Sequence, residues 1–248
     1  MNSGVQVGLE GRRALVTGGG RGLGAAIVRR LARSGAEVIV ADVREDLAKE
    51  LCESLTGEGC RAFPVVLDVR DAEAVAEVFR DLDETGQPVD ILVNNAAVDV
   101  TKAVKELTAE EMTRVVTTNL LAPMYLCREG YRRMMARGGG HIVNILSTAA
   151  LRTWTEAGPY AAAKTGLRAF THTLFKEAQR DCPGIGVTGV VAGGMETPFI
   201  MDRFPDTDVA VLQSPEIVAD TVMYALSVPP GSALAELVVV PRRETSWP

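Results

Sequence analysis

The residues best suited to chemistry are a tyrosine and a lysine four positions apart, preceded by a serine. Tyr160 and Lys164 share one face if their segment is helical. The Lys164 ammonium is expected to favour the phenolate and to lower the pKa of Tyr160 from about 10 toward the working range. Such a tyrosine can act as a general acid or base, and Ser147 can hydrogen-bond an oxygen whose charge changes. The alternative for Tyr160 and Lys164 is an ordinary exposed pair on a helix.

A second candidate site is the glycine-rich segment at positions 17–24, with the sequence TGGGRGLG. Glycines permit a tight turn and let backbone N–H groups approach a phosphate, and a following helix adds partial positive charge. The spacing differs from the GxGxxG dinucleotide fingerprint, so an ordinary glycine-rich connection is the alternative. The candidate contacts in this turn are Gly18, Arg21, Gly22, Leu23 and Gly24.

Two residues point to opposite cofactors. Asp42 closes an apolar run 20 residues after Gly22. A carboxylate there can accept hydrogen bonds from both ribose hydroxyls and repels a 2′-phosphate, which favours NAD. Arg21 can pair with a 2′-phosphate, which favours NADP. We expect NAD, because a carboxylate beside the 2′ position directly opposes a second anion; Asp42 could also serve as a helix N-cap.

The elements that must position these residues are short apolar runs separated by helix-length stretches. The runs are 14–16, 38–41, 65–67, 91–93, 142–146, 187–191 and 237–240. They are rich in Val and Ile and do not alternate with polar residues, which is typical of strands buried on both faces. We therefore predict a doubly wound parallel α/β sheet in a single domain, residues 1–248. The Pro- and Asp-containing segment 198–214 is a candidate lid over the site.

Composition excludes several classes of protein. Lys and Arg total 26 against 32 Asp and Glu, a net charge of −6, which argues against a nucleic-acid binder. We predict a soluble, cytoplasmic protein, because no apolar run reaches the length of a membrane span and the first residues lack the apolar core of a signal peptide. The four cysteines and two histidines show no metal-ligand spacing, so we expect no metal site.

Taken together, the motifs resemble those of the classical short-chain dehydrogenase/reductase family, from Arg12 to about Val240. The matching motifs in chain order are Thr17-Gly18-x3-Gly22-x-Gly24, Asp68-Val69, Asn94-Asn95-Ala96, Asn119, Ser147 and Tyr160-x3-Lys164. The resemblance implies a Rossmann-type fold and hydride transfer between NAD(H) and a secondary alcohol or ketone, with Tyr160 as acid and base. It also implies a homotetramer or dimer assembled through helices at about 108–136 and 158–181.

The resemblance assigns further roles residue by residue. Asn119 is expected to hold a water that links Lys164 to solvent, and Lys164 to contact the nicotinamide ribose. The remaining cofactor contacts implied are Asp68, Val69, Asn94, Ala96 and Thr197. An apolar substrate pocket is expected from Val98, Trp154, Met195 and Phe199, together with Leu151, Ile200 and Met201, although core packing is the first expectation for Trp154. These residues suggest a small to medium, mostly apolar substrate.

Three positions depart from the family pattern. Ala97 replaces the glycine of Asn-Asn-Ala-Gly, where its methyl group could crowd the cofactor or shift the turn. Ala192 replaces the proline of Pro-Gly, which predicts a more mobile loop before Thr197. The C-terminal Val-Asp-Gly-Gly is also missing, which weakens assignment to the fatty-acid ketoreductases. Three alternatives remain open: an NADP-dependent ketoreductase, a non-catalytic NAD-binding sensor or scaffold, and a sugar-nucleotide epimerase or dehydratase. The last is disfavoured, because such enzymes usually need a larger C-terminal substrate lobe than 248 residues allow.

Overall fold

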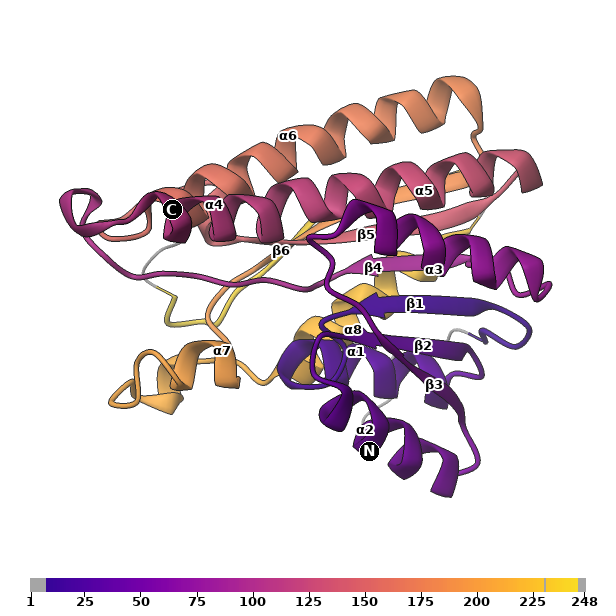
Figure 1. Cartoon of the computed structure of the whole chain (residues 1–248), viewed down its shortest axis with the longest axis horizontal. Coiled ribbons are helices and arrows are strands. Elements are labelled where there is room, and N and C mark those ends of the chain that lie inside the picture. Colours follow the sequence, from indigo (N-terminus) through magenta and orange to yellow (C-terminus); the bar gives the residue numbers. More distant parts are fainter. Residues whose placement is uncertain (1–7, 230, 245–248) are drawn as a thin grey trace.

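The computed structural model describes residues 8–229 and 231–244, and a parallel seven-stranded sheet forms its centre (Figure 1). The strands are β1 (Arg13–Thr17), β2 (Glu37–Asp42), β3 (Arg61–Val66), β4 (Ile91–Asn94), β5 (Gly140–Ser147), β6 (Ile185–Ala192) and β7 (Glu236–Val239). They are ordered β3-β2-β1-β4-β5-β6-β7, with every neighbouring pair parallel. The predicted doubly wound, Rossmann-type α/β fold is confirmed.

Helices cover both faces of this sheet. The helices are α1 (Gly22–Arg33), α2 (Glu45–Gly57), α3 (Ala72–Glu84), α4 (Ala109–Val116), α5 (Ala122–Arg137), α6 (Gly158–Asp181), α7 (Pro198–Met201) and α8 (Pro215–Leu226), with short turns η1 (Val104–Glu106), η2 (Thr117–Leu121), η3 (Thr148–Ala150) and η4 (Val209–Val211). The apolar faces of α1, α2 and α8 pack on one side, and those of α3, α5 and α6 on the other (Figure 1). None of these helices, within the described ranges, is long and apolar enough to cross a membrane.

One strand differs from its predicted place. The apolar run at 65–67 predicts a buried strand, whereas β3 runs from Arg61 to Val66. It lies at the edge of the sheet, and Phe63 and Val66 are 48% and 56% exposed. An edge strand has a neighbour on one side only, so its residues need not form a continuous apolar run.

The long helix expected over residues 108–136 is interrupted. A capping box formed by Thr108 and Glu111 starts α4, and a π-helical turn, η2, separates α4 from α5. Asn119 lies in this turn and is buried. Single π-turns inside helices frequently occur at functional sites, because the extra residue alters the direction of nearby side chains and carbonyls.

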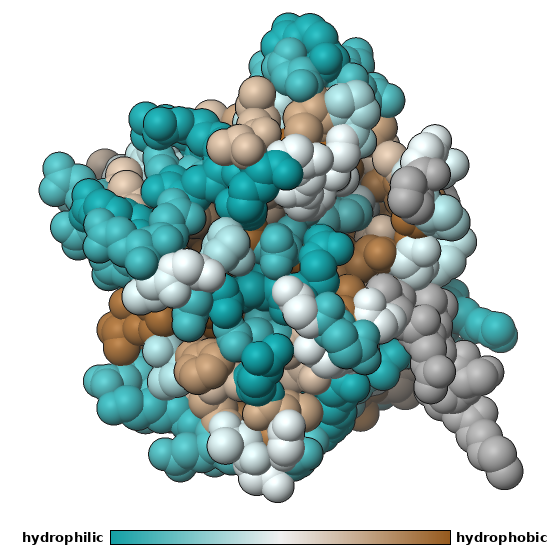
Figure 2. All heavy atoms as spheres, turned by 90° about the vertical axis from the view of Figure 1, so that its right-hand side faces the viewer, coloured by the Kyte–Doolittle hydropathy of each residue, from teal (hydrophilic) through white to brown (hydrophobic). Residues whose placement is uncertain are grey.

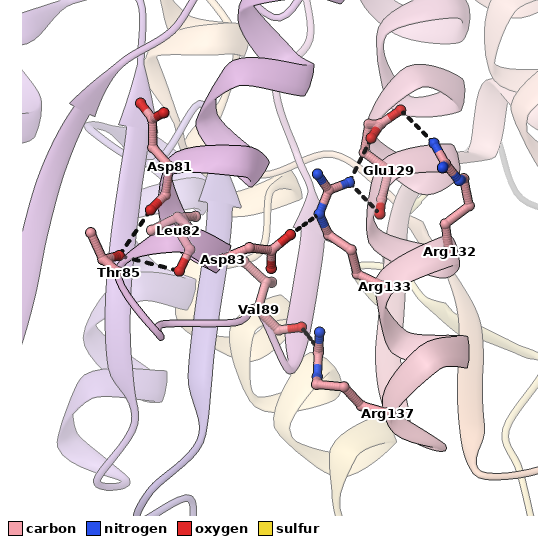
Figure 3. Close-up of polar contacts among 9 residues, drawn as sticks. All are labelled: Asp81, Leu82, Asp83, Thr85, Val89, Glu129, Arg132, Arg133 and Arg137. Carbon is pink, nitrogen blue, oxygen red and sulfur yellow. Dashed lines mark hydrogen bonds and ion pairs between the residues drawn. The ribbon is translucent and has the colours of Figure 1, made fainter.

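Polar contacts hold α5 against the end of α3 (Figure 3). The Arg133 guanidinium bridges Asp83 at the end of α3 and the buried Glu129 on α5 itself. One turn later, Arg137 donates a hydrogen bond to the Val89 carbonyl, in the segment leading into β4. These contacts secure the helix whose N-terminal side continues into the turn that carries Asn119.

The sheet also determines where a ligand can bind. Chain order reverses between β1 and β4, and open α/β sheets bind ligands at such a reversal, beyond the carboxyl ends of the strands. A cleft of about 640 Å³ lies there, lined by residues that follow β1, β2, β4, β5 and β6. The opposite end of the molecule, seen in Figure 2, is mostly hydrophilic with scattered apolar side chains.

Candidate functional site

The glycine-rich turn between β1 and α1 is packed too closely for side chains. Gly18 has a φ of +60°, and a Cβ there would lie 2.9 Å from the Ala96 Cα. A Cβ on Gly24 would lie 2.0 Å from the Gly18 carbonyl oxygen. The Asn95 side-chain amide donates to the carbonyls of Thr17 and Gly18, at 2.9 and 3.0 Å. The turn is therefore a rigid backbone surface at the N-terminus of α1.

Asp42 ends β2 with its carboxylate fixed by the backbone. It accepts hydrogen bonds from the N–H groups of Gly20 and Arg44, at 2.9 and 3.0 Å. The alternative reading of Asp42 as a helix N-cap is wrong, because Arg44 is the N-cap of α2 and has no capping side-chain hydrogen bond. The buried Asp42 side chain instead lines the cleft beside the glycine turn.

Arg21 makes an ion pair across the mouth of the cleft. Its Nη1 lies 3.1 Å from an Asp202 carboxylate oxygen, just beyond α7. Both side chains are at least half exposed, so the pair contributes little to stability. It does connect the glycine turn to the 198–214 segment, and a 2′-phosphate would compete with Asp202 for the same guanidinium.

The serine, tyrosine and lysine meet at the centre of the cleft. Ser147 ends β5, while Tyr160 and Lys164 lie on the first two turns of α6. The Ser147 side chain lies close enough to Tyr160 to lower the pKa of the phenol. Lys164 Nζ donates to the Ile145 carbonyl at 2.8 Å and lies 5.8 Å from the centre of the Tyr160 ring. All three side chains are buried, so the exposed-pair alternative does not describe them.

The electrostatics of this group differ from the sequence expectation. Burial raises the pKa of Tyr160 to about 12, and the nearby Ser147 side chain opposes this only in part. Burial also lowers the pKa of Lys164 to about 8. The expected lowering of the tyrosine pKa is therefore wrong for the protein alone, because withdrawal from water disfavours both charged forms.

A second, very small cavity lies behind Lys164. It has about 10 Å³ of space, roughly enough for one water, and is lined by Asn94, Asn119 and Lys164, among others. The Asn119 side-chain amide makes two hydrogen bonds with the Val98 backbone. Its nitrogen donates to the Val98 carbonyl at 2.6 Å, and its oxygen accepts from the Val98 N–H at 2.9 Å. Asn94 donates to Asn144 at 2.7 Å, across β4 and β5. Within the described residues, the buried Asn94 Oδ1 has no hydrogen-bond partner.

The predicted cofactor residues lie along the cleft, apart from Asn94, which lines the small cavity instead. At one end, Asp68 is held by Arg70, whose guanidinium lowers the pKa of that carboxyl. At the turn, Thr197 is buried, and a Cβ on Gly22 would lie 3.4 Å from it. Two arginines that line the cleft, Arg44 and Arg70, were not predicted from the sequence. The sequence feature that indicates them is their position just after β2 and β3.

The substrate end of the cleft is only partly as predicted. Its lining includes four expected residues, Val98, Met195, Phe199 and Ile200, and at its rim Trp154. Trp154 is 46% exposed, so the first expectation of core packing is wrong. The lining does not include Leu151 or Met201. It does include an ion pair that sequence reasoning missed, between Asp99 and Arg203.

The departures from the family pattern are accommodated locally. Glu156 is the only non-glycine residue of the described chain with a positive φ, so Ala97 is not in a glycine conformation. After Ala192, the Gly193 N–H donates to the Val239 carbonyl and the Gly194 N–H to the Glu244 side-chain carboxylate, both at 2.9 Å. One backbone and one side-chain contact from the C-terminal segment therefore brace the loop that was expected to be more mobile.

The histidines take structural positions. His141 Nε2 lies 3.0 Å from the Thr188 hydroxyl, and burial lowers the pKa of His141 to about 4. His172 Nε2 lies 3.1 Å from a Glu236 carboxylate oxygen. Over residues 8–229 and 231–244, no three His, Cys, Asp or Glu side chains are grouped as metal ligands.

Comparisons with known proteins agree with this architecture. The sequence model of the family described as short chain dehydrogenase matches residues 12–208 of this chain. An uncharacterized oxidoreductase of Thermotoga maritima is 40% identical over 189 residues, 76% of this chain and 73% of its own. Probable oxidoreductase EphD of Mycobacterium tuberculosis is 37% identical over 188 residues, 75% of this chain but only 31% of its own length.

A solved structure extends the likeness over nearly the whole chain. A single-residue variant of actinorhodin polyketide ketoreductase, determined with NADPH, is 30% identical with a TM-score of 0.87, covering 94% of this chain and 97% of its own. A sheet reversal, a glycine turn and a Ser–Tyr–Lys group thus occur together in a chain whose sequence and backbone both match one family. The protein belongs to the short-chain dehydrogenase family of oxidoreductases.

Proposed function

We propose that this oxidoreductase transfers a hydride between NAD(H) and a secondary alcohol or ketone, with Tyr160 as general acid and base. The observation that carries the proposal is the buried Ser147–Tyr160–Lys164 group at the centre of the cleft. A sensor or scaffold has no use for a buried acid–base pair that costs desolvation free energy. The alternatives are an NADP-dependent ketoreductase and a non-catalytic NAD-binding protein.

The residues present fit a dinucleotide. A Cβ on Gly18 or Gly24 would collide with neighbouring backbone, so the turn stays bare at these two positions, and it leads into the N-terminus of α1, where a pyrophosphate would bind. Gly18, Gly22 and Thr197 would hold the pyrophosphate, and Asp68, Val69 and Ala96 the adenosine. A bound nicotinamide supplies or accepts the hydride.

The protein's own groups handle the proton. With a Tyr160 pKa of about 12, the phenol keeps its proton at neutral pH and can give it to a ketone oxygen. Ser147 hydrogen-bonds the same oxygen as negative charge develops on it. Lys164, with a pKa of about 8, remains mostly charged at pH 7 and favours the phenolate that results. Once Lys164 has returned a proton to the Tyr160 phenolate, a water in the small cavity beside Asn119 would replace the proton on Lys164.

Preference for NAD is supported by the fixed carboxylate of Asp42. Its two backbone hydrogen bonds leave it no freedom to move away from a 2′-phosphate, and Arg21 is paired with Asp202. Titrating the purified protein separately with NADH and NADPH, followed by nicotinamide fluorescence, tests this. We expect NADH to bind at least ten times more tightly, and Asp42→Ala to narrow the difference. Tighter NADPH binding by the wild type would refute the preference.

The acid–base role is tested by Tyr160→Phe. This variant should abolish turnover and leave NADH affinity within about threefold, because only the hydroxyl is removed. The matched control is Thr173→Ala, at an exposed position of the same helix, where the hydroxyl donates to the Ala169 carbonyl. Full activity in Tyr160→Phe would refute the role. A wild-type protein that binds NADH but turns over no carbonyl or alcohol would favour the non-catalytic reading.

We also propose a homo-oligomer formed through α4, α5 and α6, and a lid over the site formed by residues 198–214. Support for the first comes from Met112 and Met135, which are 39% and 40% exposed on α4 and α5. Support for the second comes from the ion pair that ties Asp202 to the glycine turn. A monomeric mass in light scattering would refute the oligomer.

A further inference from the structure

A charged pair lies at the substrate end of the cleft, whose lining also includes Val98 and Phe199. Asp99 comes from the loop after β4, and Arg203 lies two residues beyond α7, 104 positions later in the chain. Their side chains are 10% and 21% exposed and form a direct ion pair. Both residues line the cleft together with Tyr160. Two charges withdrawn from water in this way cost free energy, so the pair needs a physical account.

Both partners are held in fixed orientations. One Asp99 oxygen accepts from the Val100 N–H at 2.7 Å. Arg203 Nε donates to the Phe199 carbonyl at 2.8 Å, and the guanidinium lies 4.1 Å from the centre of the Phe199 ring. The pair is therefore pre-organised before any substrate arrives.

The pair is also adjacent to the reacting group. The ring that supports Arg203, Phe199, lies 5.9 Å from the Tyr160 ring, centre to centre. Both charges act on the phenol, Asp99 raising and Arg203 lowering the pKa of Tyr160. A substrate whose carbonyl oxygen meets the Tyr160 hydroxyl would present its neighbouring carbon atoms to Asp99 and Arg203.

The chemistry of the pair discriminates among neighbouring groups. Its charges cancel, so it offers no net attraction to a carboxylate. An unsubstituted alkyl chain would remove water from two charges without replacing its hydrogen bonds. A hydroxyl group can accept from the guanidinium, which has five N–H donors, and donate to the carboxylate at the same time.

We propose that Asp99 and Arg203 form a specificity-determining pair that selects neutral substrates carrying a hydroxyl group next to the reacting carbon, namely hydroxyketones and the corresponding diols. This inference rests on the proposed ketone and alcohol chemistry and refines the expectation of a mostly apolar substrate. The apolar side chains of the cleft contact the carbon skeleton, and the ion pair hydrogen-bonds the hydroxyl group next to the reacting carbon.

The test compares ketones that share a skeleton. Reduction of 3-hydroxy-2-butanone and 2-butanone, and of 2-hydroxycyclohexanone and cyclohexanone, is followed with NADH and with NADPH. We expect kcat/KM of the wild type to be about 10- to 100-fold higher for the hydroxylated member of each pair, the effect of one or two hydrogen bonds to charged groups. Acetoacetate, which is anionic, should be reduced more slowly than 3-hydroxy-2-butanone.

The matched variants remove the pair without leaving one charge unpaired. In the double variant D99N/R203M, the preference for the hydroxylated ketone should fall to about threefold or less. The ratio cancels any general loss of activity, because both ketones share a skeleton. Asp202→Asn, which breaks only the exposed ion pair with Arg21, should retain the preference.

Each result has a distinct meaning. A double variant that loses activity equally on both ketones would show that the pair only holds the α7 segment, and would overturn the inference. Faster reduction of the unsubstituted ketones or of acetoacetate by the wild type would overturn it as well. A protein that binds NADH but reduces none of these ketones, and oxidises neither 2-butanol nor 2,3-butanediol, would refute the proposed function itself.

Discussion

Replacing Gly24 by alanine tests the close packing of the glycine turn. The new Cβ would lie 2.0 Å from the Gly18 carbonyl oxygen and 2.7 Å from the Asn95 amide nitrogen. Real Cβ contacts stay above 3.0 Å, so the backbone of Gly18 must retreat by about 1 Å. That displacement lies within the turn on which α1 begins.

The expected cost follows from overpacking a rigid site. Inserting one carbon into a well-packed site costs about 1–3 kcal/mol, and a clash with backbone lies at the upper end. We therefore expect Gly24→Ala to lose about 3 kcal/mol in urea unfolding and to weaken NADH binding more than tenfold. The two effects are separable, because binding is measured under conditions in which circular dichroism shows the variant folded.

Gly57→Ala is the matched control. Gly57 closes α2, and a Cβ there would meet nothing within 4 Å. Alanine should stabilise the protein by about 0.5–1 kcal/mol, through its higher helix propensity and the reduced entropy of the unfolded chain, and leave NADH binding intact. Wild-type stability and affinity in Gly24→Ala would show that the turn is not a close-packed phosphate cradle, and would refute the reasoning.

Three further predictions concern buried charge. Burial lowers the pKa of Lys164 to about 8, so between pH 8 and 10 the unfolded chain binds more protons than the folded one. The free energy of unfolding of the wild type should therefore rise by about 2 kcal/mol over this range relative to that of Lys164→Met. Curves of unfolding free energy against pH that run parallel for the two proteins would contradict this. His141, whose pKa burial lowers to about 4, should likewise make stability rise from about pH 4 to 6.5, a rise that is lost in His141→Gln. Arg133→Met should cost about 1–3 kcal/mol in urea, because Asp83 and the buried Glu129 lose a shared partner; an unchanged midpoint would show that the Arg133 contacts do not stabilise α5.

Local sequence patterns determined much of the fold and of the reacting group. Seven apolar runs predict the strands, because a strand covered on both faces consists almost entirely of apolar residues. Only the edge strand β3 was misplaced. Tyr160 and Lys164 were predicted as partners because a four-residue spacing has one meaning on a helix. The glycine turn was recognisable because only glycine tolerates the approach of Gly24 to the Gly18 carbonyl.

The tertiary structure decided what depends on burial and on distant parts of the chain. Arg21 and Asp202 are 181 positions apart and Asp99 and Arg203 are 104 apart, so no local spacing indicates that either pair forms. The pKa of Tyr160 rises rather than falls because the packed cleft removes water from the phenol, an effect that spacing to Lys164 does not report. Residue types and spacing therefore predict which chemistry is available, whereas desolvation and long-range pairing determine the charge of each group and which substrate groups it meets.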